Sequence, residues 1–261
     1  MHFLPPNGAL HGFALDHLLR WNLLTIFWLF VAAQVLIVLA LLTRNLRART
    51  ASASPRRSSS AAVFVLAELL PLLAITGLYV WMMVSSHRVW ADRREPGAAP
   101  DAVRVEVTGA QFEWYFRYPG DDGIYGTLRP TLVNAPAGNP LGLDPRDPHS
   151  RDDIVSSVLV LPAGRPVDLT LRSQDVIHGF FIPGMRLKQD AIPGMIGHLQ
   201  FTPTVPGNYP ILCSQVCGLG HARMQAMLRI VSPADYQHWL AARERVLLAE
   251  NAPATAAESR P

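Results

Sequence analysis

The chain has 261 residues, of which 49% are hydrophobic and 16% are charged, and its formal net charge is +3. This length accommodates one large domain or two smaller parts. The positive net charge does not indicate a nucleic-acid-binding protein, because five arginines lie together in the short segment 44–60.

Two long apolar segments near the N-terminus predict two transmembrane helices. Residues 21–43 contain no charged side chain, and residues 61–84 contain only one, Glu68. At about 1.5 Å per residue, each segment can cross the roughly 30 Å hydrocarbon core of a bilayer. The alternative of two buried core helices is disfavoured by apolar runs of this length. A cleaved signal peptide is also disfavoured, because an arginine-rich segment and no small-residue cleavage motif follows the first run.

Charge asymmetry predicts the orientation of these helices. The connecting loop 44–60 contains five arginines and no acid, whereas the N-terminal segment 1–20 offers only Arg20 and Asp16. Because basic loops stay cytoplasmic, both ends of the chain are expected on the outer face. We therefore expect a multi-pass protein of a bacterial-type inner membrane, in contact with lipid, with its larger part in the periplasm.

Residues 101–231 predict an all-β sandwich or barrel. They follow a linker, 85–100, that is rich in proline, glycine and charge. Short segments in which apolar and polar residues alternate are separated by Pro, Gly, Asn and Asp, a pattern typical of such folds. These segments are VRVEVTG, FEWYFRY, IVSSVLVLP, VDLTLRS, GHLQFTP, GNYPILCS and MQAMLRIVS. Residues 119–153, rich in turn-forming residues, are expected to form a surface excursion.

The C-terminal part predicts a short helix and a tail. Ser232 followed by Pro233 is a helix cap with proline at the first helical position, so we expect a helix over 232–250. The tail 251–261 is expected to be disordered.

Both cysteines of the chain lie in the twelve residues CSQVCGLGHARM, 213–224. Outside the cytoplasm two cysteines can form a disulfide. A disulfide, however, would explain neither His221 nor Met224. Two thiolates, an imidazole and a thioether are a soft ligand set suited to copper, so the loop predicts a copper site.

A second imidazole is needed, and His178 in RSQDVIHGFFIPG is the candidate, at the end of a β-like run. A single blue-copper ion uses two His, one Cys and a weak axial Met, which would leave one cysteine over. Two cysteines and two histidines instead suit two coppers bridged by both sulfurs. Met224 and a backbone carbonyl between the cysteines would be the weak axial ligands. Such a centre has no open position, which favours electron transfer over substrate chemistry.

These motifs resemble cytochrome c oxidase subunit II of the haem–copper oxidase superfamily. The family's loop, Cys-Ser-x-x-Cys-Gly-x-x-His-x-x-Met, matches CSQVCGLGHARM without a gap. The segments DVIHGFFIPGMRLKQDAIPG and VTGAQFEWYFRY are similar to the family's first-histidine and aromatic stretches. The resemblance implies two membrane helices and a cupredoxin-like domain with a binuclear copper centre, CuA. It implies as copper ligands His178, Cys213, the backbone carbonyl of Gln215, Cys217, His221 and Met224.

The match departs from the family at three places. Gln215 stands where the family commonly has a glutamate that also serves a magnesium site, so the resemblance does not imply magnesium here. Phe112 stands at the first tryptophan of the aromatic stretch, the proposed point of electron transfer into the family's domain. Trp114 is the alternative for that role, or a core residue. The excursion 119–153 is longer than the matched blocks.

Two further positions have competing interpretations. Asp190 and Lys188 either support the copper loop or the contact with the catalytic subunit, or they form an ordinary surface pair. Glu68, a carboxylate inside a predicted membrane helix, is a functional candidate by default. It corresponds to a family glutamate at the mouth of a proton path, or it is protonated and hydrogen-bonded to a neighbouring helix.

The resemblance implies the electron-transfer subunit of a membrane terminal oxidase, an oxidoreductase that couples oxygen reduction to proton translocation. Its partners would be a haem-bearing catalytic subunit I, other oxidase subunits, and cytochrome c or another small periplasmic carrier. The absence of a Cys-x-x-Cys-His motif excludes a covalently attached c-type haem on this chain. A CuA subunit of a nitric oxide reductase and a copper-delivery protein remain as alternatives. Residues 101–231 carry twelve acidic and eleven basic side chains, so charge alone does not select a basic donor.

Overall fold

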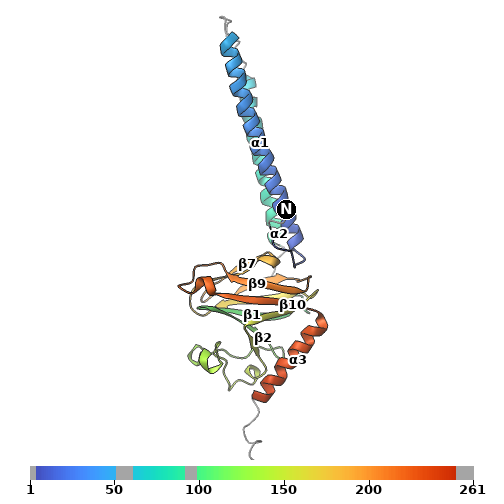
Figure 1. The fold of residues 1–261 in the computed structure, drawn as a ribbon, viewed down its shortest axis with the longest axis vertical. Coiled ribbons are helices and arrows are strands. Elements are labelled where there is room, and N and C mark those ends of the chain that lie inside the picture. The colour runs from blue at the N-terminus through green and yellow to red at the C-terminus, as the bar shows by residue number, and fades with distance from the viewer. Residues whose placement is uncertain (1–3, 51–60, 92–98, 251–261) are drawn as a thin grey trace, which may run out of the picture. The chain divides into compact units, whose positions relative to one another are not determined.

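The computed structural model describes residues 4–50, 61–91 and 99–250 (Figure 1). Within these ranges the side chains of 46–50, 61–64, 66–68, 90–91 and 248–250 are not described. The chain forms two compact units, one of Ala14–Asp92 and one that combines Met1–Phe13 with Arg93–Pro261. The predicted tail 251–261, most of the loop 44–60 and part of the linker 85–100 lie outside the described residues.

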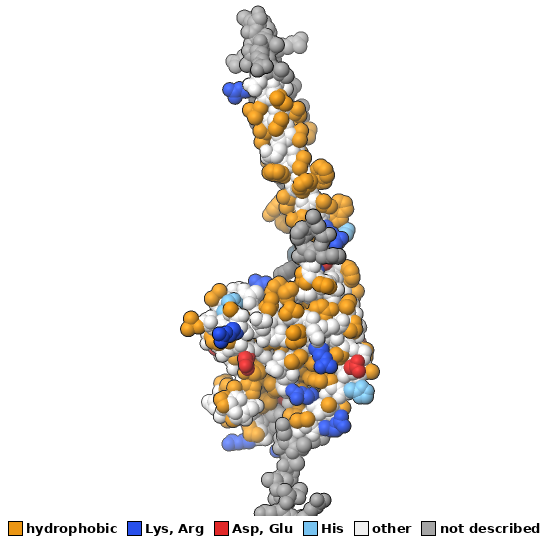
Figure 2. Space-filling view, in the orientation of Figure 1, with side chains coloured by type: hydrophobic (Ala, Val, Ile, Leu, Met, Phe, Trp, Pro, Cys, Tyr) orange, Lys and Arg blue, Asp and Glu red, His pale blue; other side chains and the backbone are white. Residues whose placement is uncertain are grey.

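Two long helices, α1 (Gly12–Thr50) and α2 (Ala61–Ala91), account for the apolar N-terminal part. Both extend beyond the predicted spans 21–43 and 61–84, because the polar residues that flank each apolar run continue the same helix. Large apolar side chains are exposed along both helices, and hydrophobic side chains cover much of the helical part in Figure 2. In the part of the chain that the structure describes, two stretches are long and apolar enough to cross a membrane, Gly12–Asn45 and Leu69–Val89.

The second unit contains a β-sandwich of two five-stranded sheets, packed face to face (Figure 1). The first sheet has the order β3 (Ile154–Ser156), β2 (Glu113–Tyr118), β1 (Val103–Ala110), β5 (Val167–Ser173) and β8 (Gly197–Phe201). The second has the order β4 (Val158–Pro162), β10 (Gln225–Val231), β9 (Gly207–Cys213), β6 (His178–Ile182) and β7 (Leu187–Ala191). A C-terminal helix, α3 (Pro233–Glu250), follows. The predicted fold class of two apolar helices, a β-sandwich and a C-terminal helix is confirmed.

The core lies between the sheets and follows the alternation of the strands. In β5, Val167, Leu169 and Leu171 are buried, whereas the residues between them are partly exposed. Each such side chain contributes about 1.5–3 kcal/mol by its burial. α3 packs against the sandwich through Trp239, whose ring centroid lies 5.0 Å from that of Tyr118.

Three strand predictions need correction. The segment IVSSVLVLP forms two strands, because the chain bends at Ser157 and passes from the first sheet (β3) to the second (β4). β6 and β7 are additional strands, and His178 begins β6, whereas the sequence predicted the end of a strand there. β6 was missed because four of its five residues are buried, so it lacks the alternation by which a half-exposed strand is recognised.

The excursion 119–153 is tied to the first sheet by a buried arginine. Arg117 on β2 is 2% exposed and lies 3.3 Å from Glu106 and 3.4 Å from Asp153. Its guanidinium also donates a hydrogen bond of 2.7 Å to the carbonyl of Gly126. The excursion is therefore packed through Arg117 and Asp153, and it is not only a surface loop.

The start of the chain also packs on the sandwich. Ala9 is completely buried and forms a β-bridge with Pro203, just after β8. The predicted segment 1–20 thus divides into a part that docks on the β-sandwich and the first turns of α1.

Candidate copper site

Strand pairing brings the two separated parts of the copper motif together. β9 pairs antiparallel with β6, with Phe180 opposite Cys213. On its other side β9 pairs with β10, and the Cys213 amide donates to the Met224 carbonyl at 3.2 Å. The last residue of β9, the first residue of β6 and the start of β10 therefore meet at one end of the second sheet. His178 and Cys213, 35 positions apart in sequence, become neighbours for this reason.

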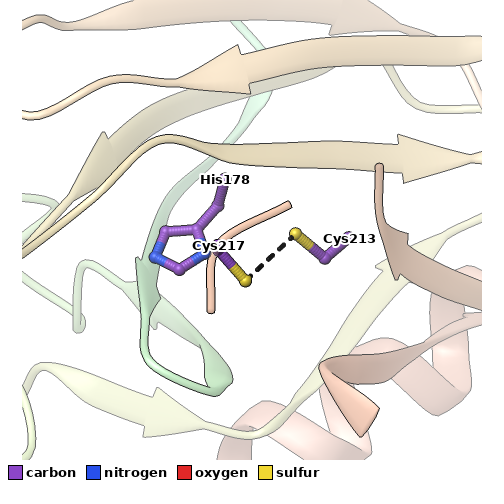
Figure 3. Close-up of side chains that lie close together, drawn as sticks. All are labelled: His178, Cys213 and Cys217. Carbon is purple, nitrogen blue, oxygen red and sulfur yellow. Dashed lines mark hydrogen bonds between the residues drawn. The ribbon is translucent and has the colours of Figure 1, made fainter. Parts of the chain in front are cut away.

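Three predicted ligand residues converge there, as Figure 3 shows. Ligand atoms of His178, Cys213 and Cys217 all lie within 4.8 Å of one another. The two sulfurs are 3.8 Å apart and both cysteines are free. The two cysteines therefore do not form the disulfide that the sequence left open.

One ring nitrogen of His178 forms a hydrogen bond and the other forms none. His178 is completely buried, and its Nε2 lies 2.7 Å from a carboxylate oxygen of Asp175. Its Nδ1 is buried without a hydrogen-bond partner. Because a carboxylate can only accept, Nε2 donates this bond, and in the neutral imidazole Nδ1 then keeps a free lone pair. A buried lone pair without a donor is the arrangement that a metal ion would satisfy.

The other predicted ligands surround the two sulfurs. His221 Nδ1 and Met224 Sδ each lie 3.7 Å from the Cys217 sulfur. The Cys213 thiol donates to the Gln215 carbonyl at 3.1 Å, so this carbonyl faces the site. The structure thus brings together all six residues that the family resemblance implied. Glu68 belongs to α2, and its side chain is not among the described ones.

Burial makes the free thiols weak acids. It raises the pKa of Cys217 to about 11, with a further contribution from the hydrogen bond to Cys213. The thiol is therefore neutral at physiological pH until a cation compensates the thiolate, and metal binding would release protons. Two sulfurs, two imidazoles and a thioether fit copper better than a hard ion such as magnesium.

Two residues that the sequence analysis did not single out hold the site together. Asp175 accepts hydrogen bonds from His178 and, at 2.7 Å, from the backbone amide of Gln111. Burial opposes its negative charge, but these bonds and one from the Val176 amide together lower the pKa of Asp175. The side chain of Gln111 in turn donates to the Cys217 carbonyl at 2.5 Å. The signal in the sequence was an aspartate three residues before a ligand histidine, a common partner of metal-binding imidazoles.

The side chain of Gln215, which replaces the glutamate common in the family, bonds a neighbouring carboxylate. Its side-chain amide donates to a carboxylate oxygen of Asp190 on β7 at 2.9 Å. A glutamate at this position would place two carboxylates side by side and require a cation or a proton between them. The neutral amide bonds one oxygen of Asp190 without either. Asp190 thus contacts the loop 213–224, which agrees with one of the roles that the sequence left open.

The aromatic pair occupies two different environments. Trp114 is 1% exposed and contacts the imidazole of His178 edge-on, with ring centroids 5.8 Å apart, so it belongs to the core. Phe112 is half-buried and its ring lies over the copper loop at Gly220, where an added Cβ would be only 2.3 Å from the ring.

Comparison with known proteins shows which proteins the chain is similar to. The family model described as the periplasmic domain of cytochrome C oxidase subunit II matches residues 103–231. The alternative cytochrome c oxidase subunit 2 of Bradyrhizobium diazoefficiens is 42% identical over 142 residues, covering 54% of this chain and 50% of that protein. The cytochrome c oxidase subunit 2 of a Synechocystis species is 34% identical over 151 residues, covering 58% of this chain and 36% of that protein.

The crystal structure of the periplasmic domain of subunit II of cytochrome oxidase from Bradyrhizobium japonicum is 24% identical, with a TM-score of 0.42, and the match covers 58% of this chain and 98% of that one. The chain spans half or less of the length of the curated relatives named above. The match of the family model extends from the start of β1 to the end of β10, so the β-sandwich of this chain matches the periplasmic domain of cytochrome c oxidase subunit II.

Proposed function

We propose that this chain is the electron-accepting subunit of a membrane-bound terminal oxidase. It receives electrons from cytochrome c or a similar small carrier at a binuclear copper centre. It passes them to haem in a separate catalytic subunit, where oxygen reduction is coupled to proton translocation. The observation that carries this proposal is the unpartnered, buried Nδ1 of His178 beside two free cysteine sulfurs.

The two bridged copper ions would supply reversible one-electron transfer. Cys213, Cys217, His178 and His221 would hold the ions. Met224 and the carbonyl of Gln215 would complete the ligand set. His178, Cys217 and Met224 are 0%, 4% and 1% exposed, so they exclude water. A site that is enclosed and fully ligated leaves no position for a substrate, which supports electron transfer.

Exposed apolar side chains next to the ligands provide a docking surface for the donor. Val216 and Leu219 in the copper loop and Ile177 beside His178 are 86%, 107% and 46% exposed. They carry no charge, so a small carrier would dock here mainly through apolar contacts around a short electron path. The near-zero net charge of residues 101–231 agrees with this mode.

The location of the domain follows from the helices. Two apolar helices with an arginine-rich connection support a chain anchored in the inner membrane, with the β-sandwich on the periplasmic side. The docking of Ala9 on the sandwich supports the same topology, because the N-terminus and the sandwich must then lie on one side of the membrane.

The alternatives have less support. The relatives reported above are named as subunits of cytochrome c oxidases, which favours oxygen over nitric oxide as the terminal acceptor. A copper-delivery protein needs an exchangeable site, and the burial of His178, Cys217 and Met224 disfavours this.

Copper analysis of the purified full chain tests the proposal. We expect two copper ions per chain and a purple colour in the mixed-valence state. Cys217→Ser should reduce the content to one ion or none, because a bridging thiolate is lost. Met227→Leu is the matched control and should keep both, since Met227 is 41% exposed on β10, outside the ligand set. One copper per wild-type chain, or a disulfide in copper-loaded protein, would show the proposal to be wrong.

A further inference from the structure

The first residues of the chain form hydrogen bonds with the β-sandwich in both directions. The Gly8 amide donates to the Gly184 carbonyl at 2.8 Å, and the Gly8 carbonyl accepts from the Thr204 amide at 2.7 Å. The Leu10 amide donates to the Thr202 carbonyl at 3.0 Å. We call residues 4–10 the N-terminal strap.

Side chains fix the strap in its place. Arg186, which follows the 3-10 turn η4 (Pro183–Met185), donates to the Pro5 carbonyl at 2.7 Å. Ala9 is completely buried and is part of the core cluster of the sandwich. Gly8 is tightly enclosed, because an added Cβ would lie 2.4 Å from Met185 Cε and 2.7 Å from the Tyr209 hydroxyl.

The strap also provides hydrogen-bond partners for backbone groups of the sandwich. Gly184, Thr202 and Thr204 lie outside the paired strands, so the strap satisfies backbone groups that no neighbouring strand reaches. A buried backbone group without a partner costs about as much as a lost hydrogen bond. The strap therefore completes the edge of the domain beyond β8 and beside η4.

We propose that the N-terminal strap is an intramolecular partner of the β-sandwich and gives the domain a second attachment to the membrane-spanning part. The first attachment runs from α2 through residues 92–98 into β1. The second is the strap itself, because α1 begins at Gly12, two positions after the bonded Leu10. The proposal does not depend on copper, since none of the strap contacts involves a ligand residue.

The consequence is mechanical. A domain joined to its anchor by one stretch of chain can turn, and an electron-transfer site then spends time in unproductive orientations. Two attachments at different points of the domain restrict this rotation. Releasing the strap should therefore loosen the domain without unfolding it.

Hydrogen–deuterium exchange on the full chain in lipid nanodiscs tests the proposal. The amides of Gly8, Leu10 and Thr204 should be protected in the wild type. In Gly8→Val, whose side chain would have to displace Met185 Cε and the Tyr209 hydroxyl, we expect their exchange to be at least about tenfold faster. Leu10→Ala is the control and should keep the protection, because its side chain is 62% exposed and its amide is unchanged.

Two comparisons make the result decisive. The amides of β5 should stay protected in all variants, which shows that the sandwich stays folded. A variant lacking residues 4–9 should release the Thr204 amide as Gly8→Val does. Unprotected strap amides in the wild type would overturn the proposal. So would unchanged exchange of Thr204 in the deletion variant.

Discussion

Among single residues, Asp175 has the most consequential position outside the ligand set, because it bonds both His178 and the Gln111 backbone. Asp175→Asn replaces one accepting oxygen by a donor, so one of these bonds is lost. We expect copper affinity to fall about 10–100-fold, since the imidazole is less firmly held with Nδ1 toward the cysteines. Competition with a chelator measures this. Asp168→Asn on β5 is the control, and an affinity equal to that of wild type in Asp175→Asn would contradict the positioning role.

Met224 provides a second prediction at the residue scale. Leu has a similar volume but no sulfur donor, so Met224→Leu should keep copper and the packing of this 1% exposed side chain. The reduction potential should rise, because loss of a weak axial donor favours reduced copper. A rise of about 30 mV in this one-electron centre corresponds to about 0.7 kcal/mol. Voltammetry that finds no change in potential would remove Met224 from the ligand set.

Gln215 is expected to behave differently from Met224. Its backbone carbonyl faces Cys213, and its side chain bonds Asp190 outside the copper position. Gln215→Ala should therefore keep both coppers and a nearly unchanged spectrum, while the free energy of unfolding falls by about 0.5–1.5 kcal/mol from the lost hydrogen bond. Metal analysis and urea denaturation measure the two effects. Loss of copper in this variant would show that the side chain itself is needed.

At the scale of elements, the excursion 119–153 depends on a buried charge cluster whose stability varies with pH. Burial raises the pKa of Asp153 to about 6, although Arg117 and the Gly126 amide oppose this shift. In the unfolded chain an aspartate titrates near about 3.9. Between these values the folded chain holds a proton that the unfolded chain has lost. This stabilising contribution is complete below about pH 4 and is lost as the pH rises to about 6.

Asp153→Asn should remove this pH dependence, because an amide does not ionise. We expect the free energy of unfolding to fall less steeply between about pH 4 and 6 in the variant than in the wild type. Urea denaturation at several pH values measures the slope. The exposed Asp101→Asn is the matched control and should follow the wild type. Parallel curves for Asp153→Asn and wild type would show that Asp153 does not titrate in this range.

For the whole molecule, the arginine-rich connection and the docked strap make one prediction about topology. A reporter fused after Pro261 should be active outside the cytoplasm, and one inserted near Ser54 should be active inside it, because five arginines hold that loop on the cytoplasmic face. Paired periplasmic and cytoplasmic reporters at both positions measure this. The reverse pattern would place the copper loop out of reach of any periplasmic donor.

The sequence by itself was sufficient wherever the information is local. The apolar runs of α1 and α2 are visible because a membrane-spanning helix needs only length and composition. Most strands are visible from their alternation, as in β5. Five of the six candidate ligands, four side chains and one carbonyl, lie in the loop 213–224. They are separated by two to four residues, so their spacing alone indicates a metal site.

Tertiary structure decided everything that depends on contacts between distant segments. Pairing of β6 with β9 places His178 beside Cys213, and only the fold shows that Asp175 links this histidine to Gln111. No periodic pattern in the sequence indicates that Arg117 is buried under the excursion. None indicates that the strap docks near Thr204 either. These contacts involve backbone groups, which every residue has, and single side chains that belong to no recognisable motif. They are therefore determined only when the packed sheets bring those positions together.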